Sequence, residues 1–235
     1  MAAFEEFSFS VDSFSGVARI FPLPSLVLFP HVMQPLHIFE PRYRSLLQDA
    51  VSGDRLIAMA LLAPGWQDDY EGRPATYPIA CLSRITTWHQ LQDGTYNLLV
   101  LGLRRVRLVR ELDATKDFRE ARVELCADDC LPQDGFASVA LQRKLRDAFR
   151  RVAAMLPEAQ EQLDQLLGSD VPLGVLTDVI SYMLEIEPAE KEALLAEVNV
   201  CRRGRLLLRH LRAMSADRQP ARGGALVFPP QFSAN

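Results

Sequence analysis

The stretch FPLPSLVLFPHVMQPLHIFEPRYRSLLQDA, residues 21–50, decides the fold of this chain. It contains short apolar runs bounded by prolines, followed by a helix with a sharply defined start. We predict short strands over Ala18–Leu23 and Leu26–Phe29, which the neighbouring prolines restrict to sheet edges or strand ends. Leu36–Phe39 is a third short apolar run. This pattern indicates the opening of a small β-rich domain.

The helix in this stretch is predicted from its first residue onward. Pro41 occupies the first helical position after Glu40, where its missing N–H costs nothing. Apolar residues then recur at i, i+3, i+4 and i+7, which predicts one buried stripe made of Tyr43, Leu46, Leu47 and Ala50. Gly53 follows as the expected stop. Glu40 and Arg44 have the i, i+4 spacing of an ion pair that contributes about 0.2–0.5 kcal/mol.

Further strands follow this helix along the chain. Segments with strand-like apolar patterns are Arg55–Leu62, Tyr77–His89, Tyr96–Leu101, Leu103–Leu112 and Arg119–Cys126. Asp93-Gly94 is a hairpin turn signal, and Ala63–Ala75 is a polar loop marked by glycine and proline. Six or seven short strands around one helix predict a partly closed, barrel-like sheet.

Helical periodicity replaces the strand pattern after the composition shift at Ala127–Gly135. We predict helices over Val139–Leu156, from near Pro172, from Pro188 and over Val200–Met214. The expected organisation is therefore an α+β fold in five parts: an arm at 1–16, a β-domain at 17–126, a linker at 127–135, a helical bundle at 136–214 and a tail at 215–235.

Three segments of the sequence resemble the amino-terminal domain of Lon-type ATP-dependent proteases, across roughly residues 17–214. They are PLPSLVLFPHVMQPLHIFEPRYRSLL, then PIACLSRI with DGTYNLLVLGLRRVRL, then LTDVISYMLEIEPAEKEALLAEVNVCRRGRLLLRHL. The resemblance implies a PUA-like, partly closed β-barrel with one inserted helix, followed by a carboxyl-terminal helical bundle. It also implies a module that engages polypeptide substrates. We expect a structural role for the motif residues Phe29, Pro30, Pro35, Phe39, Glu40, Arg42 and Tyr43.

The sequence departs from a full-length Lon protease in ways that argue against catalysis. It has no G-x-x-x-x-G-K-[ST] phosphate loop, and no room after Met214 for an ATPase and a Ser–Lys protease domain. A G-x-S-x-G nucleophile motif is also absent. We therefore expect a stand-alone substrate-binding domain with no enzymatic activity and no cofactor.

Composition and charge exclude several classes of protein. The formal net charge of −4 argues against a dedicated nucleic-acid binder, which needs a basic surface. The sequence contains no run of eighteen apolar residues, so no membrane span is predicted. The amino terminus starts with acids, unlike a secretory signal, and the four cysteines are sparse. These features predict a cytoplasmic protein.

The histidines and cysteines are the candidate residues for an enzyme active site or a metal site. An enzyme with an unrecognised site would require His31, His37 or His89 to converge with a carboxylate in a pocket. Cys126 and Cys130 have a C-x₃-C spacing, but no second Cys/His pair completes a zinc site. We expect incidental thiols in a linker, and no metal.

Arginines gather in two segments, which keeps an RNA-associated PUA-like protein open as an alternative. The residues are Arg104, Arg105, Arg107 and Arg110, and then Arg202, Arg203, Arg205, Arg209 and Arg212. No aromatic residues alternate with them, as stacking on single strands requires. We expect solvated faces.

The interaction candidates are aromatic residues in the predicted loop and tail. Trp66 and Tyr70 lie in the loop at 63–75, and Phe228 lies in the apolar tail patch Ala225–Pro230. Such residues serve as interface anchors when exposed, although a loop of this kind can also fold back over the barrel. The leading hypothesis is a non-catalytic module for exposed apolar segments of unfolded polypeptides, working as an adaptor for a separate ATP-dependent protease in protein quality control.

Overall fold

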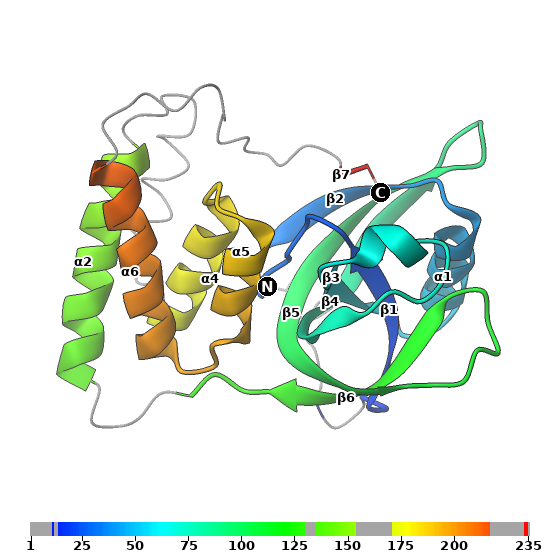
Figure 1. Cartoon of the computed structure of the whole chain (residues 1–235), viewed down its shortest axis with the longest axis horizontal. Coiled ribbons are helices and arrows are strands. Elements are labelled where there is room, and N and C mark those ends of the chain that lie inside the picture. Colours follow the sequence, from blue (N-terminus) through cyan, green and yellow to red (C-terminus); the bar gives the residue numbers. More distant parts are fainter. Residues whose placement is uncertain (1–10, 12–13, 130–134, 154–170, 217–232, 235) are drawn as a thin grey trace, which may run out of the picture.

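A curved mixed sheet lies beside a set of helices (Figure 1). The computed structural model describes residues 11, 14–129, 135–153, 171–216 and 233–234. The sheet half contains β1 (Val17–Leu23), β2 (Met33–Ile38), α1 (Pro41–Ser52), β3 (Leu56–Leu62), the short 3₁₀ helix η2 (Trp66–Asp69), β4 (Thr76–Gln90), β5 (Tyr96–Glu111) and β6 (Arg119–Cys126). The helical half contains α2 (Gly135–Ala153), α4 (Leu173–Met183), α5 (Pro188–Ala196) and α6 (Val200–Ala216), and β7 (Ser233–Ala234) returns to the sheet.

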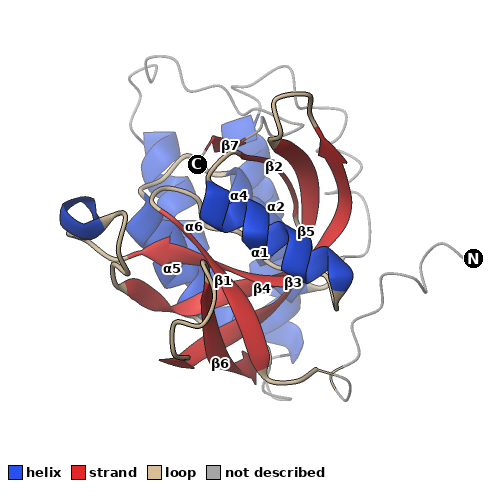
Figure 2. Cartoon of the chain, turned by 90° about the vertical axis from the view of Figure 1, so that its right-hand side faces the viewer, coloured by secondary structure: helices blue, strands red, loops and turns tan. Residues whose placement is uncertain are grey.

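The strands form a partly closed ring. Their order is β4-β3-β1-β6-β5-β2-β7, and an additional β4–β5 pairing joins the two arms of the sheet. The β1–β3 and β2–β7 pairs are parallel, and the other pairs are antiparallel. Figure 2 shows α1 lying across the ring. The predicted α+β fold, with one helix inserted among the strands and helices after them, is confirmed.

The apolar run Leu26–Phe29 is buried but forms no strand, so this prediction is wrong. Val27, Leu28 and Phe29 are at most 3% exposed, in irregular backbone. Pro24 and Pro30 flank the run, and neither has an N–H group with which a ladder could extend beyond it. In contrast, Pro22 fits inside β1, because the pairing of β1 with β6 ends at Ile20.

A glycine lets this irregular segment cross closely over β5. A Cβ atom at Gly102 would lie 2.1 Å from the carbonyl oxygen of Phe29. Gly102 N–H donates to the Val32 carbonyl, and His31 N–H donates to the Gly102 carbonyl, each at 2.8 Å. Because Gly102 continues the ladder while admitting the crossing, β5 is one sixteen-residue strand. The sequence pattern predicted two separate strands here.

Helix α1 follows the prediction closely, with one correction. Its four stripe residues are at most 2% exposed, and Gly53 N–H donates to the Ala50 carbonyl where the helix ends. The expected Glu40–Arg44 ion pair is wrong, because Glu40 pairs with Arg42 at 2.8 Å. Glu40 has an extended backbone at the N-cap, so the i, i+4 rule for helical side chains does not apply to it.

Helices α4 and α5 lie between the sheet and the α2–α6 pair (Figure 1). The starts of α4, α5 and α6 match the predictions, whereas α2 begins at Gly135, inside the expected linker. One hydrophobic cluster extends from Phe21 and Tyr43 in the sheet half to Leu176 and Leu207 in the helical half. Within the described ranges, no helix is long and apolar enough to span a bilayer.

A charge cluster that is buried except at Asp128 joins the two halves; we call Arg105, Asp128, Asp178 and Arg203 the junction cluster. Arg105 of β5 donates through Nη1 to Asp178 Oδ2 of α4 at 3.2 Å and through Nε to the Leu195 carbonyl of α5 at 2.7 Å. Arg203 of α6 donates through Nη2 to Asp128 Oδ2 at 2.8 Å, and its Nε lies 3.3 Å from Asp178 Oδ1. Strand and helices are therefore held by the same carboxylates.

Two of the arginines predicted to face water are thus buried. Arg105 is 2% exposed and Arg203 is 0% exposed, whereas the other seven members of the two arginine groups are exposed as predicted. The prediction for these two is wrong because their charge partners are far away in sequence: Asp178 is 73 residues from Arg105. Each buried guanidinium has a carboxylate partner, which burial of a charge requires.

Candidate functional site

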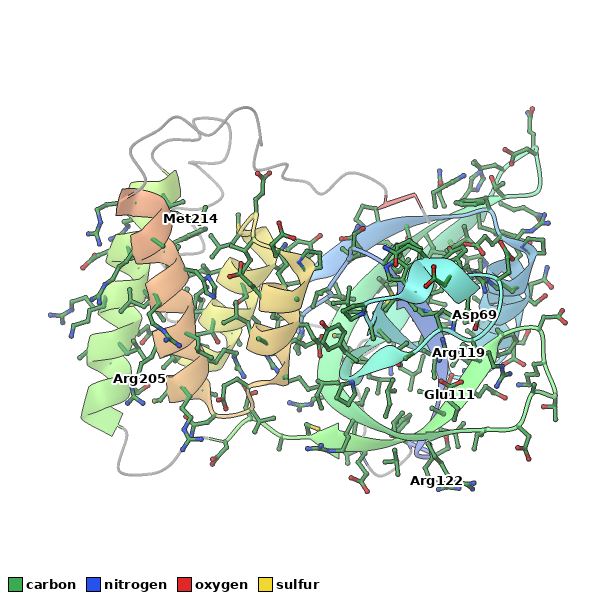
Figure 3. The ribbon with its side chains drawn as sticks, viewed as in Figure 1. Asp69, Glu111, Arg119, Arg122, Arg205 and Met214 are labelled. Atoms are coloured by element: carbon green, nitrogen blue, oxygen red, sulfur yellow. The ribbon has the colours of Figure 1, made fainter. Side chains whose placement is uncertain are left out.

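A cavity of about 280 Å³ opens on the sheet half, beside α1. Its walls come from β1, from α1, from residues 71–73 and from residues 114–119 at the start of β6. Arg119 and Glu111, which hold two of these walls together, lie close to each other on the same side of the molecule as Asp69 (Figure 3).

The apolar, buried residues of the cavity lining form what we call its floor. Ile20 and Pro22 are two residues apart on β1, so both side chains point to the same face of the sheet. Tyr43 from the buried stripe of α1 and Phe118 complete the floor, and they are 2% and 6% exposed. A floor of this kind favours an apolar side chain over a polar one.

Arg119 fixes the two loops that form the outer wall. It is 7% exposed, its Nε donates to Glu111 Oε2 at 3.0 Å, and its Nη2 donates to the other Glu111 oxygen. Its Nη1 donates to the Pro74 carbonyl at 2.8 Å. One guanidinium therefore ties the loop at 63–75 to β5 and β6. Such bidentate pairs are geometrically specific, and they keep the wall in one position.

Three residues hold the loop at 63–75, which carries Trp66 and Tyr70, against α1. We call Glu40, Arg42 and Tyr70 the loop clamp. The Tyr70 hydroxyl donates to Glu40 Oε1 at 2.7 Å, and Arg42 Nε donates to Glu40 Oε2 at 2.8 Å. Arg42 Nη1 donates to the Tyr70 carbonyl at 3.2 Å, and its guanidinium carbon lies 4.9 Å from the centre of the Tyr70 ring. Partial burial raises the pKa of Tyr70, and the hydrogen bond to Glu40 raises it further, so the hydroxyl stays a donor at neutral pH.

The loop clamp carries an aromatic pair next to the cavity. Trp66 in η2 packs edge-on against Tyr70, with ring centres 5.5 Å apart, and both residues are half-buried. Arg42 belongs both to the loop clamp and to the cavity wall. The structure therefore brings the predicted residues Trp66 and Tyr70 together at one site. Phe228, the third predicted residue, lies outside the described residues.

The rim of the cavity is charged but balanced. Among the described cations that line it, Arg42 pairs with Glu40, Arg119 and more distantly Arg73 pair with Glu111, and Lys116 pairs with Asp49 at 2.8 Å. Lys116 also lies over the Phe118 ring, 5.1 Å from its centre. Because these cations have carboxylate partners, the rim offers little uncompensated charge to a phosphate backbone.

The motif residues divide between the core and this site. Phe29, Pro30 and Tyr43 are buried, Pro35 is half-buried, and Phe39 is 43% exposed; Glu40 and Arg42 form the loop clamp. Sequence reasoning missed Glu111, Phe118 and Arg119. No local pattern marks them, because their partners lie on other elements.

The histidines do not meet a carboxylate in this cavity. His37 on β2 contacts the Asn97 side chain through Nδ1 at 2.8 Å, and His89 lies opposite Asn97 on β4. His31 is exposed, with a positive φ of 67°. In the described ranges, no group of three or more histidine, cysteine or acidic residues is arranged to hold a metal ion. Cys130, half of the C-x₃-C pair, falls outside these ranges.

Comparison with known proteins places this geometry in a family. Residues 17–213 match the family model of the ATP-dependent protease La (LON) substrate-binding domain. Lon protease 2 of Myxococcus xanthus is 29% identical over 192 residues, which cover 82% of this chain and 23% of that protein. This chain thus spans about a quarter of the length of the curated relatives it matches.

Two solved structures share the fold. A Lon N-terminal domain protein from Xanthomonas campestris has a TM-score of 0.56 at 23% identity, covering 82% of this chain and 97% of that one. The N-terminal domain of the Mycobacterium avium complex Lon protease has a TM-score of 0.65 at 16% identity, covering 86% and 100%.

Proposed function

The chain belongs to the Lon substrate-binding domain family, and from this premise we propose that it is a non-catalytic module that holds exposed apolar segments of unfolded polypeptides. The observation that carries the proposal is the apolar-floored cavity beside the Trp66–Tyr70 pair. An apolar side chain of the bound polypeptide enters the cavity. The backbone of that polypeptide then lies beside the aromatic pair.

The energetics of such a site suit apolar segments of varied sequence. Burying one large apolar side chain contributes about 1.5–3 kcal/mol. Half-buried Trp and Tyr provide further contact area at low entropic cost, as anchors in protein interfaces do. Because the described rim cations are paired, this binding depends little on salt concentration.

The proposal extends to a cytoplasmic adaptor role in protein quality control. In this role, a separate ATP-dependent protease receives the polypeptide that this module has bound. The support is the family itself, whose model is named for substrate binding, and curated relatives that are named Lon proteases.

The test is fluorescence anisotropy with a labelled, permanently unfolded polypeptide, at low and moderate salt. We expect saturable binding that survives added salt. Trp66→Ala should weaken it about tenfold or more, because loss of an interface anchor costs at least 1–2 kcal/mol. The matched control is Trp88→Ala, which removes a 39%-exposed tryptophan on β4 and should leave the affinity unchanged.

Two results would contradict the proposal. One is the absence of saturable polypeptide binding. The other is an equal loss of affinity in the Trp66 and Trp88 variants, since binding would then not depend on the aromatic pair beside the cavity. A labelled RNA measured in parallel separates the RNA-associated alternative, which predicts binding that collapses as salt rises.

A further inference from the structure

The outer edge of β2 is covered by a very short strand. Leu36 and His37 pair in parallel with Ser233 and Ala234 of β7, whereas β2 itself has six residues. Figure 1 shows β7 lying along β2, far from the end of α6. Among the described residues, the rest of this edge has no strand partner.

The backbone direction along β2 follows from its pairing with β5. Gly102 N–H donates to the Val32 carbonyl, so Val32 and Gly102 form a hydrogen-bonded pair. Antiparallel ladders alternate, so Gln34, Leu36 and Ile38 exchange hydrogen bonds with β5. The N–H and C=O groups of Met33 and His37, and the carbonyl of Pro35, therefore point toward the outer edge.

The first half of this edge is restricted. Pro35 has no N–H to donate, and one lone pair of its carbonyl accepts a hydrogen bond from Gln34 Nε2 at 2.6 Å, which leaves the other lone pair for β7. Gln34 is in turn held by the hydroxyl of Tyr182, which donates to Gln34 Oε1 from α4. A proline at an edge strand is a common way to prevent strand addition.

The second half of the edge is open at His37, where β7 pairs. Phe39, just beyond β2, is 43% exposed, and its ring centre lies 6.3 Å from that of His37. An open edge next to an exposed aromatic side chain is a template for an extended segment, because main-chain pairing provides affinity and a neighbouring side chain adds contact area.

We propose that the His37 edge of β2 is a strand-addition site for an extended polypeptide, and that Ser233–Ala234 occupies it as an intramolecular competitor. This inference rests on the proposed function for the identity of the incoming ligand. A segment of the same chain acts at an effective concentration in the millimolar range, so even weak pairing fills the site. Two paired residues remain easy to displace by a segment that also covers Phe39.

The test breaks the ladder between β7 and β2. The variant Ser233→Pro/Ala234→Pro cannot donate to β2 from either residue, so β7 no longer holds a carbonyl opposite the His37 N–H, whereas the control Ser233→Ala/Ala234→Ser keeps both N–H groups. Hydrogen exchange measured by NMR at the His37 amide should be about tenfold faster in the proline variant and unchanged in the control. The affinity for the unfolded polypeptide should rise about threefold or more in the proline variant, because the competitor no longer lowers the free fraction of the site.

A third measurement separates this inference from the proposed function. A synthetic peptide with the sequence FPPQFSAN, residues 228–235, should slow exchange at His37 in the proline variant. Unchanged His37 exchange in that variant would overturn the occupancy by β7, and equal polypeptide affinity in the proline variant and the control would overturn the competition. If no form binds the polypeptide while FPPQFSAN still protects His37, the proposed function fails and the edge site stands.

Discussion

The junction cluster and the loop clamp use the same chemistry at different degrees of burial, although Asp128 of the junction cluster is 34% exposed. In both, arginine guanidinium groups meet carboxylates at about 3 Å. The side chains of Arg105, Asp178 and Arg203 are at most 2% exposed, whereas those of Arg42 and Glu40 are 19% and 13% exposed. The junction cluster orders the two halves of the fold, and the loop clamp holds one surface loop.

This difference shows that burial, and not residue type, decides what an arginine does in this protein. A buried ion pair that loses one member leaves a charge without a partner in a medium where it cannot be solvated. At the partly exposed loop clamp, water replaces a lost partner at small cost.

The largest expected effect comes from breaking the junction cluster. Asp178→Ala removes the fully buried carboxylate between Arg105 and Arg203 and leaves them only the 34%-exposed Asp128, so the free energy of unfolding should fall by about 3–5 kcal/mol. Urea denaturation measures this loss. Asp147→Ala is the control, because Asp147 is 53% exposed on α2 and should cost less than about 0.5 kcal/mol. Similar midpoints for the two variants would contradict the importance of burial.

Glu192 extends the comparison of buried and exposed charges to a buried carboxyl group that has no cation partner among the described residues. Glu192 of α5 is 3% exposed, and neither of its carboxyl oxygens has a hydrogen-bond partner among the described residues. Burial raises the pKa of Glu192 to about 8, so the folded protein retains a proton that the unfolded chain releases near pH 4.5. The folded state therefore binds more protons in this range, and stability must fall as pH rises from about 5 to 8.

Glu192→Gln removes the ionisation and should abolish this loss of stability, about 2–4 kcal/mol between the two ends of the range. Thermal or urea unfolding at pH 5, 6.5 and 8 measures it. The matched control is Glu190→Gln, an exposed residue on the same helix, which should keep the slope of the parent protein. A parallel pH profile for Glu192→Gln and the parent would show that Glu192 is ionised in the fold.

A smaller effect is expected at the loop clamp. Tyr70→Phe deletes the hydrogen bond to Glu40 and should lower the free energy of unfolding by about 0.5–1 kcal/mol. Because the released loop opens more often, endoproteinase Glu-C should cleave after the exposed Glu71 faster, as measured by gel or mass spectrometry. Tyr77→Phe is the control, since its hydroxyl has no described hydrogen-bond partner. Equal cleavage in both variants would mean that the hydroxyl does not restrain the loop.

The smallest effect on stability is expected at Trp66. Its ring is half-buried and rests on the loop clamp, so Trp66→Ala should change the free energy of unfolding by less than about 0.5 kcal/mol. Paired with the tenfold loss of polypeptide affinity expected above, this result would separate binding from folding. If urea denaturation showed that the free energy of unfolding falls by more than about 2 kcal/mol, Trp66 would instead be acting as a core residue.

The parts of the fold that sequence predicted have local causes. Pro41 and the stripe on α1 lie within ten residues, and Asp93-Gly94 produces its own turn, with Gly94 at a φ of +81°. The run Leu26–Phe29 shows the limit of local reasoning. Its apolarity correctly predicted burial, but a strand also needs a ladder partner, and the position of β5 beneath it is not encoded in those four residues.

The candidate site was only half predictable for the same reason. The residue types of Trp66 and Tyr70 marked the loop as an interaction candidate. Arg119 reaches that loop from 45 residues away, at the Pro74 carbonyl, and nothing near Arg119 in the sequence indicates the contact. Likewise, Asp178 interrupts the apolar pattern of α4 without revealing that its partners are Arg105 and Arg203.

The central place of β1 in the sheet has a consequence for the synthesis of the chain on the ribosome. Among the described strands β1 is made first, yet it needs β3 on one side and β6 on the other. After β3 ends at Leu62, 64 further residues must be synthesised before β6 is complete at Cys126. At ribosomal speeds this takes about 3–13 s, during which an apolar strand keeps one edge open. For those seconds the nascent chain is itself an exposed apolar polypeptide, of the class that its finished fold is proposed to hold.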